Sequence, residues 1–154
     1  MFTQKSGVPS DWRYVALAAR QLFSVVFIIA SAGHFTDATI AAAAGQGLPM
    51  AGVLVPLSGL IALAGGLSLL LGIRARLGAW LLVTFLVPVT LMMHNFWAVS
   101  DPAIFAFQLM LFVRNVIMLG GALIVAHVGA GSLSLDALLA EPVPLDCEAG
   151  TVVS

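Results

Sequence analysis

Charged positions are rare along this chain, and long uncharged stretches separate them. The stretches without Asp, Glu, Lys or Arg are 21–36, 38–73 and 77–100. In the last third, Arg114 alone interrupts the uncharged stretch 102–135. Because a helix needs about 20 mostly apolar residues to cross a bilayer, this pattern predicts four membrane-spanning helices. We expect them at about 14–34, 50–72, 77–98 and 103–127.

The connections between these spans contain residues that begin or end helices. Gly47 and Pro49 break the chain before the second span, and Pro49 suits a first helical turn. Asp101 followed by proline is typical of a cap at the start of the fourth span. Between the first two spans, 38–44 is expected to form a short interfacial helix, capped by Thr36 or Asp37.

The fold class predicted is therefore all-α, an integral membrane bundle of four transmembrane helices. Arginines 74 and 76 lie in the loop between the second and third spans, on the side that also holds Lys5 and Arg13. Since Lys and Arg favour cytoplasmic loops, both termini are predicted to be cytoplasmic. The expected organisation is an N-terminal segment at 1–13, a transmembrane domain at 14–128 and a C-terminal tail at 129–154.

A signal peptide is the alternative reading of the first span. Ala30-Ser31-Ala32 resembles the small-residue site at which signal peptides are cleaved. The apolar pattern, however, already begins at Tyr14, upstream of Arg20. The whole stretch is then long enough to span a bilayer, so we expect the first span to be retained.

Composition supports a membrane protein and excludes several other classes. Hydrophobic residues make up 61% of the 154 residues and charged residues 8%, too few charges to cover a soluble globule. The net charge of −1 offers no basic patch for nucleic acid, so that partner is excluded. Cys147 is the only cysteine and cannot form an internal disulfide or a thiolate metal site. No metal site is expected. The lipid bilayer is the first expected binding partner.

Ionisable and amide side chains inside the spans are the candidate functional residues, because each is unfavourable in lipid unless it is paired. Counted from the outer turn near Asp101, His94 and Gln108 lie roughly 10 Å deep and Arg114 roughly 20 Å deep. Arg114 is expected to face the bundle interior or a wet cavity. Arg20, near the inner end of the first span, is expected to extend to the head groups.

These residues suggest a site near the outer leaflet. His34 ends the first span, and two imidazoles could hydrogen-bond a ligand or pass protons near neutral pH. Without a carboxylate or thiolate, the two histidines fall short of a zinc shell. The alternative is that they are interfacial residues bonded to water or to Gln108. The ligand-binding candidates are His34, His94, Asn95, Gln108, Arg114 and Asn115.

Several short motifs, in order, resemble the DoxX family of small bacterial inner-membrane proteins, which is related to the DoxD subunit of thiosulfate:quinone oxidoreductase. The resemblance runs from about Arg20 to Asp136. The motifs are Ala32-Gly33-His34-Phe35, Gly47-Leu48-Pro49, Gly65-Gly66-Leu67, Met93-His94-Asn95-Phe96-Trp97, Arg114-Asn115, Gly129-Ala130-Gly131 and Ser134-Leu135-Asp136. The resemblance implies a multi-pass protein of the bacterial inner membrane with a quinone-linked role. Ala62 stands where family members usually have a glutamate, which removes the obvious counter-charge for Arg114.

Three functions follow as hypotheses. The first is an accessory subunit of a membrane redox system that binds a quinone-like molecule in a cavity among the first, third and fourth spans. It would act in catalysis only within a quinone-linked oxidoreductase complex, with no cofactor of its own apart from the bound quinone. The second is a membrane anchor for a soluble redox enzyme, suggested by the acids Asp136, Glu141, Asp146 and Glu148. The third is a small transporter. Expected partners are a soluble or membrane redox protein and, in a homo-oligomer, a second copy.

Overall fold

The computed structural model describes residues 11–140, and every regular element within that range is helical. In order, the elements are α1 (Trp12–Gly33), α2 (Asp37–Gly45), α3 (Ala51–Leu71), α4 (Ala75–Met93), the 3-10 turn η1 (Phe96–Ala98), α5 (Pro102–Val128) and α6 (Leu135–Leu139). Four segments, α1, α3, α4 with η1, and α5, are long and apolar enough to cross a membrane. The predicted number of spans is confirmed.

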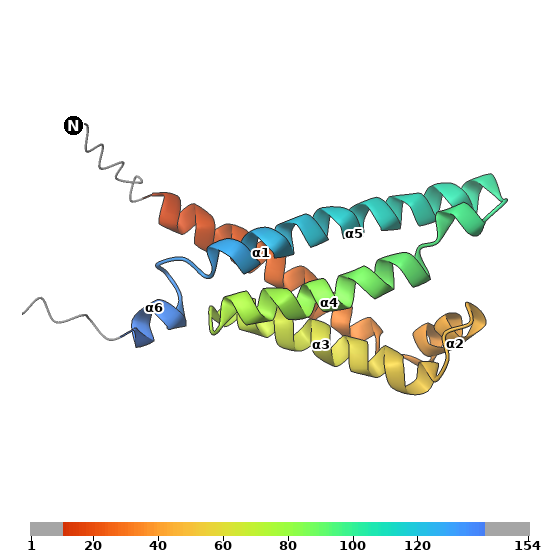
Figure 1. The fold of residues 1–154 in the computed structure, drawn as a ribbon, viewed down its shortest axis with the longest axis horizontal. Helices are drawn as coiled ribbons and strands as arrows, with labels where there is room; N and C mark the ends of the chain where they lie inside the picture. The colour runs from red at the N-terminus through yellow and green to blue at the C-terminus, as the bar shows by residue number, and fades with distance from the viewer. Residues whose placement is uncertain (1–10, 141–154) are drawn as a thin grey trace, which may run out of the picture.

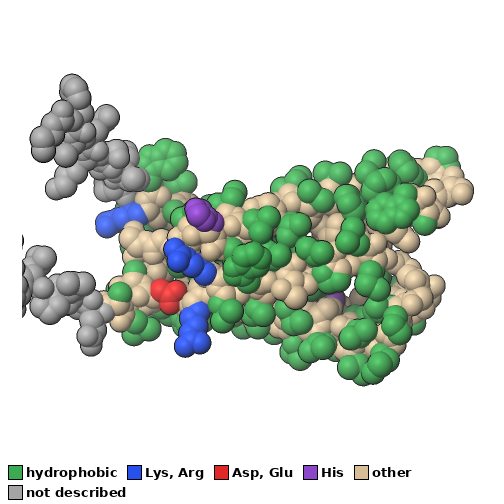
Figure 2. Space-filling model, in the orientation of Figure 1, with side chains coloured by type: hydrophobic (Ala, Val, Ile, Leu, Met, Phe, Trp, Pro, Cys, Tyr) green, Lys and Arg blue, Asp and Glu red, His purple; other side chains and the backbone are tan. Residues whose placement is uncertain are grey.

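The long helices pack in chain order, α1 on α3, α3 on α4 and α4 on α5, while α2 lies on α3. Figure 1 shows that the start of α1, the α3–α4 turn and α6 lie at one end of the molecule, and that α2 and the α4–α5 connection lie at the other. We call these the basic end and the α2 end. Figure 2 shows blue arginine side chains gathered at the basic end, while green hydrophobic side chains are spread over the remaining visible face.

Several predicted helix ends are confirmed by their caps. The Asp101 carboxylate accepts hydrogen bonds from the backbone N–H groups of Ala103 (2.9 Å) and Ile104 (3.0 Å), and Pro102 begins α5. Thr36 caps α2 by accepting from the Thr39 N–H at 3.4 Å. Of the two caps proposed for this short helix, Thr36 is therefore the one used.

Two details of the predicted spans are wrong, although α3 itself lies within one residue of the predicted 50–72. Pro49 does not lie in the first turn of the second span, because α3 begins at Ala51 after Met50, which has a left-handed backbone (φ 51°). The third span was expected to continue as one helix to 98, but α4 ends at Met93. His94 has φ −124° and ψ 49°, which are not helical angles. His94 therefore lies at the end of α4 rather than within it.

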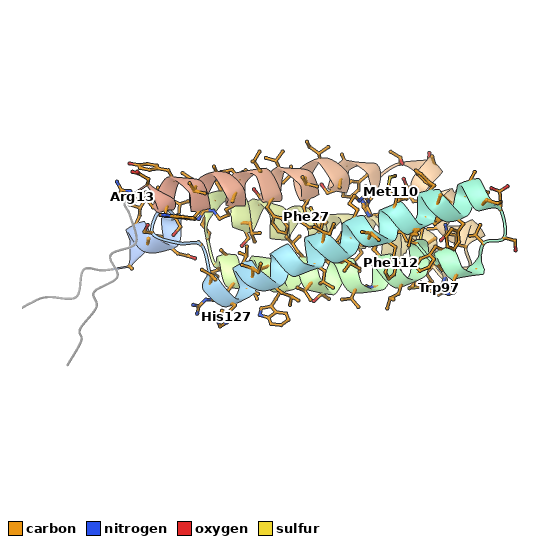
Figure 3. All side chains as sticks on the ribbon, turned by 90° about the horizontal axis from the view of Figure 1, so that it is seen from above. Arg13, Phe27, Trp97, Met110, Phe112 and His127 are labelled. Carbon is orange, nitrogen blue, oxygen red and sulfur yellow. The ribbon has the colours of Figure 1, made fainter. Side chains whose placement is uncertain are left out.

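The core lies where α1, α3, α4 and α5 meet. Its fully buried members include Ala62, Leu69 and Leu82, and Phe27 of α1 packs with them. Figure 3 shows Phe27 directed from α1 into the molecule. Close contact between α3 and α4 depends on Gly65, since a methyl group there would lie 2.9 Å from the Gly78 carbonyl oxygen. Small residues thus let these two backbones approach, as lipid-embedded helices require.

A network of long-range hydrogen bonds closes the basic end. Arg20 is buried, and its guanidinium donates to the backbone carbonyls of Ala130 and of Leu133 (2.9 Å). The expectation that Arg20 extends to the head groups is therefore wrong. The Asp136 carboxylate accepts from the backbone N–H of Arg74 at 2.9 Å, at the start of α4. These contacts hold residues 130–136 against α1 and the α3–α4 turn.

The same contacts bear on the anchor hypothesis. Asp136 was one of the four acids that suggested a docking tail. Its carboxylate, however, accepts from the Arg74 N–H, and its backbone N–H donates to the Gly72 carbonyl at 3.0 Å. Both groups therefore stabilise the fold. The other three acids, Glu141, Asp146 and Glu148, lie outside the described residues, as does Cys147.

Candidate ligand cavity

An apolar cavity of about 260 Å³ lies between α3 and α4 near the α2 end. Aliphatic and aromatic side chains form most of its wall, and α2 with the following loop covers part of it. Its lining includes Ala43, Leu48, Val55, Ile61, Phe85 and Val89. Exposed side chains of Leu57 (47%) and Met92 (47%) stand at its margin, so it borders the surface that faces lipid.

His34 contributes an imidazole to this cavity from the end of α1. Its ring lies 5.3 Å from the Phe85 ring in an edge-to-face arrangement. Gly59 makes room for it, because a Cβ at that position would come within 2.6 Å of the His34 Cβ. The position of the imidazole is therefore fixed by contacts from α3 and α4.

The hydrogen bond of the His34 ring assigns its tautomer. Nδ1 lies 3.0 Å from the Ala30 carbonyl oxygen, which can only accept, so Nδ1 carries a proton. Nε2 makes no hydrogen bond with any residue of the described range 11–140. In the neutral ring Nε2 is an acceptor, and in the protonated ring it is a donor. The imidazole can thus serve either a hydroxyl or a carbonyl group.

Three hydroxyls also line the cavity, but each already has a partner. Ser58 donates to the Val55 carbonyl at 2.7 Å, Thr84 donates to the Trp80 carbonyl at 2.9 Å, and the Thr39 hydroxyl pairs with that of Thr36 at 2.9 Å. Because these hydroxyls already make hydrogen bonds within the chain, Nε2 of His34 is the atom of the cavity wall that can hydrogen-bond a ligand. The site combines apolar walls with one imidazole nitrogen.

Sequence reasoning missed most of this cavity. Pro88 lines it, and because proline has no N–H, the Thr84 carbonyl one turn earlier lacks its usual helical donor. A proline within a predicted span was the signal that marked this region, because proline leaves a carbonyl of its own helix without a donor. Gly59 and Ser58 carried no comparable signal, because both are common in packed transmembrane helices.

His94 and Gln108 form a second group that is separate from the cavity. Nδ1 of His94 lies 3.1 Å from Oε1 of Gln108, which joins the end of α4 to α5 as the interfacial alternative predicted. Asn95 lines a different depression at the α2 end, beside Gln46 and Trp97. His94 is not among the residues that line the cavity beside His34. That cavity lies between the second and third spans, whereas the one expected from the sequence lay among the first, third and fourth.

Arg114 and Asn115 form a third group, near the middle of α5. Nη2 of Arg114 lies 3.4 Å from Oδ1 of Asn115, a long hydrogen bond. Asn115 is buried, whereas Arg114 is exposed. Of the two expectations for Arg114, that it faces the bundle interior is therefore wrong, and that it faces a wet cavity stays a prediction. An arginine at the centre of a lone helix in lipid is unfavourable by about 2.5–3.5 kcal/mol even on lenient scales.

Ala62 does not share the surroundings of Arg114. It is fully buried in the core formed with Phe27, Leu69 and Leu82, while Arg114 lies on the outer surface of α5. A carboxylate at position 62 would enter the core rather than that surface. For metals, residues 11–140 hold no group of three or more His, Cys, Asp or Glu side chains that could bind an ion.

Comparison with known proteins places these features in a family. Residues 15–95 match the family DoxX. The inner membrane protein YqjF of Escherichia coli (strain K12) is 28% identical over 123 residues, which cover 80% of this chain and 90% of that protein. No solved structure matches the chain. Every residue that lines the cavity falls within 15–95, whereas Gln108, Arg114 and Asn115 fall outside it.

Proposed function

This chain belongs to the DoxX family and spans the inner membrane several times, and from that premise we propose that it binds a quinone-like molecule as an accessory subunit of a membrane redox system. The observation that carries the proposal is the apolar cavity of about 260 Å³ with the His34 imidazole on its wall. Small-molecule sites are mostly apolar concavities with a few placed polar groups, and this cavity has that character.

The cavity suits the ring of a quinone better than a whole long-tailed molecule. Its volume lies just below the range of about 300–1,000 Å³ that drug-sized ligands occupy, so one substituted ring is the expected occupant. Leu57 and Met92 at the margin are exposed toward lipid. An isoprenoid tail would therefore leave between α3 and α4 into the acyl chains.

The chain itself would bind the quinone and form a hydrogen bond with it. A quinone, when bound, supplies two-electron carrier chemistry, and its two ring oxygens need hydrogen-bonding partners. With Nδ1 held by the Ala30 carbonyl, His34 would meet a ring oxygen through Nε2. A neutral imidazole accepts from a hydroxyl and a protonated one donates to a carbonyl, so the same atom serves either form.

Binding of a short-chain benzoquinone to the purified protein, measured by equilibrium dialysis in detergent, tests the proposal. His34→Leu should weaken binding about fivefold, since one hydrogen bond contributes about 1 kcal/mol. Ser58→Phe should abolish it by filling the cavity. His127→Leu, which changes an exposed imidazole near the end of α5, is the matched control and should bind as the unaltered protein does.

Circular dichroism on each variant separates loss of binding from loss of fold. Quinone binding that is unchanged in both His34→Leu and Ser58→Phe would contradict the proposed site. Absence of saturable binding by the unaltered, folded protein would contradict the proposed function itself.

A further inference from the structure

The guanidinium of Arg114 lies near the middle of the membrane with almost no partner. It is located roughly 18 Å along α5 from Pro102 and roughly 21 Å from Val128. Arginine has five N–H donors and stays charged. Within residues 11–140, its side chain makes a single hydrogen bond, the 3.4 Å contact with Asn115. The side chain is exposed, so something outside the described residues must satisfy it.

Neither this chain nor a second copy of it can supply a carboxylate at that depth. The acids of the whole chain are Asp11, Asp37, Asp101, Asp136, Glu141, Asp146 and Glu148. None lies inside α1, α3, α4 or α5. In a symmetric dimer through α5, one Arg114 would face the other, which is repulsive. A phosphate head group lies roughly 15 Å from the mid-plane of a bilayer core, about ten helical residues away.

Arg114 is surrounded by an exposed apolar surface. Phe107, Met110 and Ile117 lie about one or two turns away on the same side of α5, and they are 55%, 58% and 68% exposed. We call these three residues with Arg114 the Arg114 face. Figure 3 shows Met110 on the side of α5 nearer α1 and Phe112 on the other side, towards Trp97. The Arg114 face therefore points away from α4.

The first span leaves this face open. About two turns beyond Arg114, Gly121 lies against α1, since a Cβ there would come within 2.6 Å of the Phe23 ring. From there toward the α2 end, Figure 1 shows α1 and α5 separating. A membrane-spanning helix that lies along the Arg114 face would thus have α1 at one side and the Arg114 cation opposite its middle.

We propose that the Arg114 face binds a membrane-spanning helix of another protein that carries an aspartate or glutamate near mid-membrane. Arginine and a carboxylate pair through two parallel hydrogen bonds, and the low dielectric of the acyl core strengthens their attraction. Each charge would be unfavourable alone in lipid, so pairing satisfies both. The apolar side chains around Arg114 supply the packing that associates helices in a bilayer. This inference does not rest on the quinone cavity.

Model peptides test the proposal without knowledge of the natural partner. The purified full-length protein is labelled with a fluorescence acceptor at Cys147 and reconstituted in phosphatidylcholine vesicles. A donor-labelled leucine-rich transmembrane peptide with one central Glu is then titrated against otherwise identical peptides with central Leu or Gln. The Glu peptide should associate at least tenfold more tightly than the Leu peptide, and more tightly than the Gln peptide.

Variants of this chain assign the preference to Arg114. Arg114→Leu and Arg114→Gln should both lower association of the Glu peptide to the level of the Leu peptide. Arg114→Lys should retain part of the preference, because it keeps the charge but loses the planar fork. Arg76→Leu removes an exposed arginine at the basic end and is the matched control, which should keep the full preference. Circular dichroism confirms that each variant is folded.

Three results would overturn the proposal. The first is equal association of the Glu and Leu peptides with the folded, unaltered protein. The second is a Glu preference that survives in both Arg114→Leu and Arg114→Gln. The third is self-association of the protein without peptide that is lost on substitution of Arg114, which would make a second copy the occupant of the Arg114 face.

Discussion

Arg20 and Arg114 show that arginines in membrane helices can have opposite environments. Arg20 is buried and donates to two backbone carbonyls, whereas Arg114 is exposed with one long hydrogen bond. Arg20→Met should therefore destabilise the protein by about 1–3 kcal/mol, because the carbonyls of Ala130 and Leu133 lose their donor. Unfolding in a denaturing detergent, followed by circular dichroism, measures this free energy.

The control for Arg20 is a cation at the same end of the molecule. Arg76 is exposed, and its guanidinium makes no hydrogen bond within residues 11–140, so Arg76→Met should change the free energy of unfolding by less than about 0.5 kcal/mol. A loss in Arg76→Met equal to that in Arg20→Met would show that the charge, rather than the carbonyl contacts, matters. The sequence placed Arg20 within a span and Arg76 in a loop, but it could not predict the burial of Arg20, since the carbonyls that Arg20 binds lie more than a hundred positions away.

Helix pairs in this fold depend on particular glycines rather than on glycine content. Gly65 of α3 faces α4, where an added methyl group would lie 2.7 Å from Leu82 and 2.9 Å from the Gly78 carbonyl. Gly65→Ala should therefore push the helices apart and lower the free energy of unfolding by about 1–3 kcal/mol. The same detergent-unfolding measurement tests this on purified protein.

Gly120 of α5 is the matched control for Gly65, because nothing lies within 4 Å of a methyl group placed there. Gly120→Ala should leave stability unchanged or raise it by up to about 1 kcal/mol through helix propensity. Equal destabilisation in the two variants would contradict the close contact between α3 and α4. Both glycines lie in apolar helices and look alike in the sequence, but only Gly65 lies at a close helix contact.

For the whole molecule, apolar length predicted the spans but not which way each helix faces. Four uncharged stretches were sufficient to predict the number of spans. The caps Thr36 and Asp101 could be predicted because their contacts are local. The candidate site could not be predicted, since it depends on the rotation of each helix about its axis. Depth placed His34 and His94 together, but the structure directs one into the α3–α4 cavity and the other toward Gln108. A single sequence holds no record of those rotations.

Orientation in the membrane is a property of the whole chain, and the placement of its arginines predicts it. Arg13, Arg74 and Arg76 gather at the basic end, and α2 lies at the other (Figures 1 and 2). Because cytoplasmic loops retain Lys and Arg, the basic end should face the cytoplasm and α2 the periplasm. In a Cys147→Ser background, Gln46→Cys at the α2 end should react with a membrane-impermeant maleimide in intact spheroplasts. Ser132→Cys at the basic end should react only after permeabilisation.

Both probe positions are exposed in the structure, so failure to react reports the side of the membrane rather than burial. The reverse labelling pattern would place Arg74 and Arg76 outside. It would also turn the margin of the His34 cavity toward the cytoplasmic leaflet, because that cavity lies near the α2 end. The orientation therefore decides from which leaflet a quinone would enter the cavity and reach the Nε2 atom of His34.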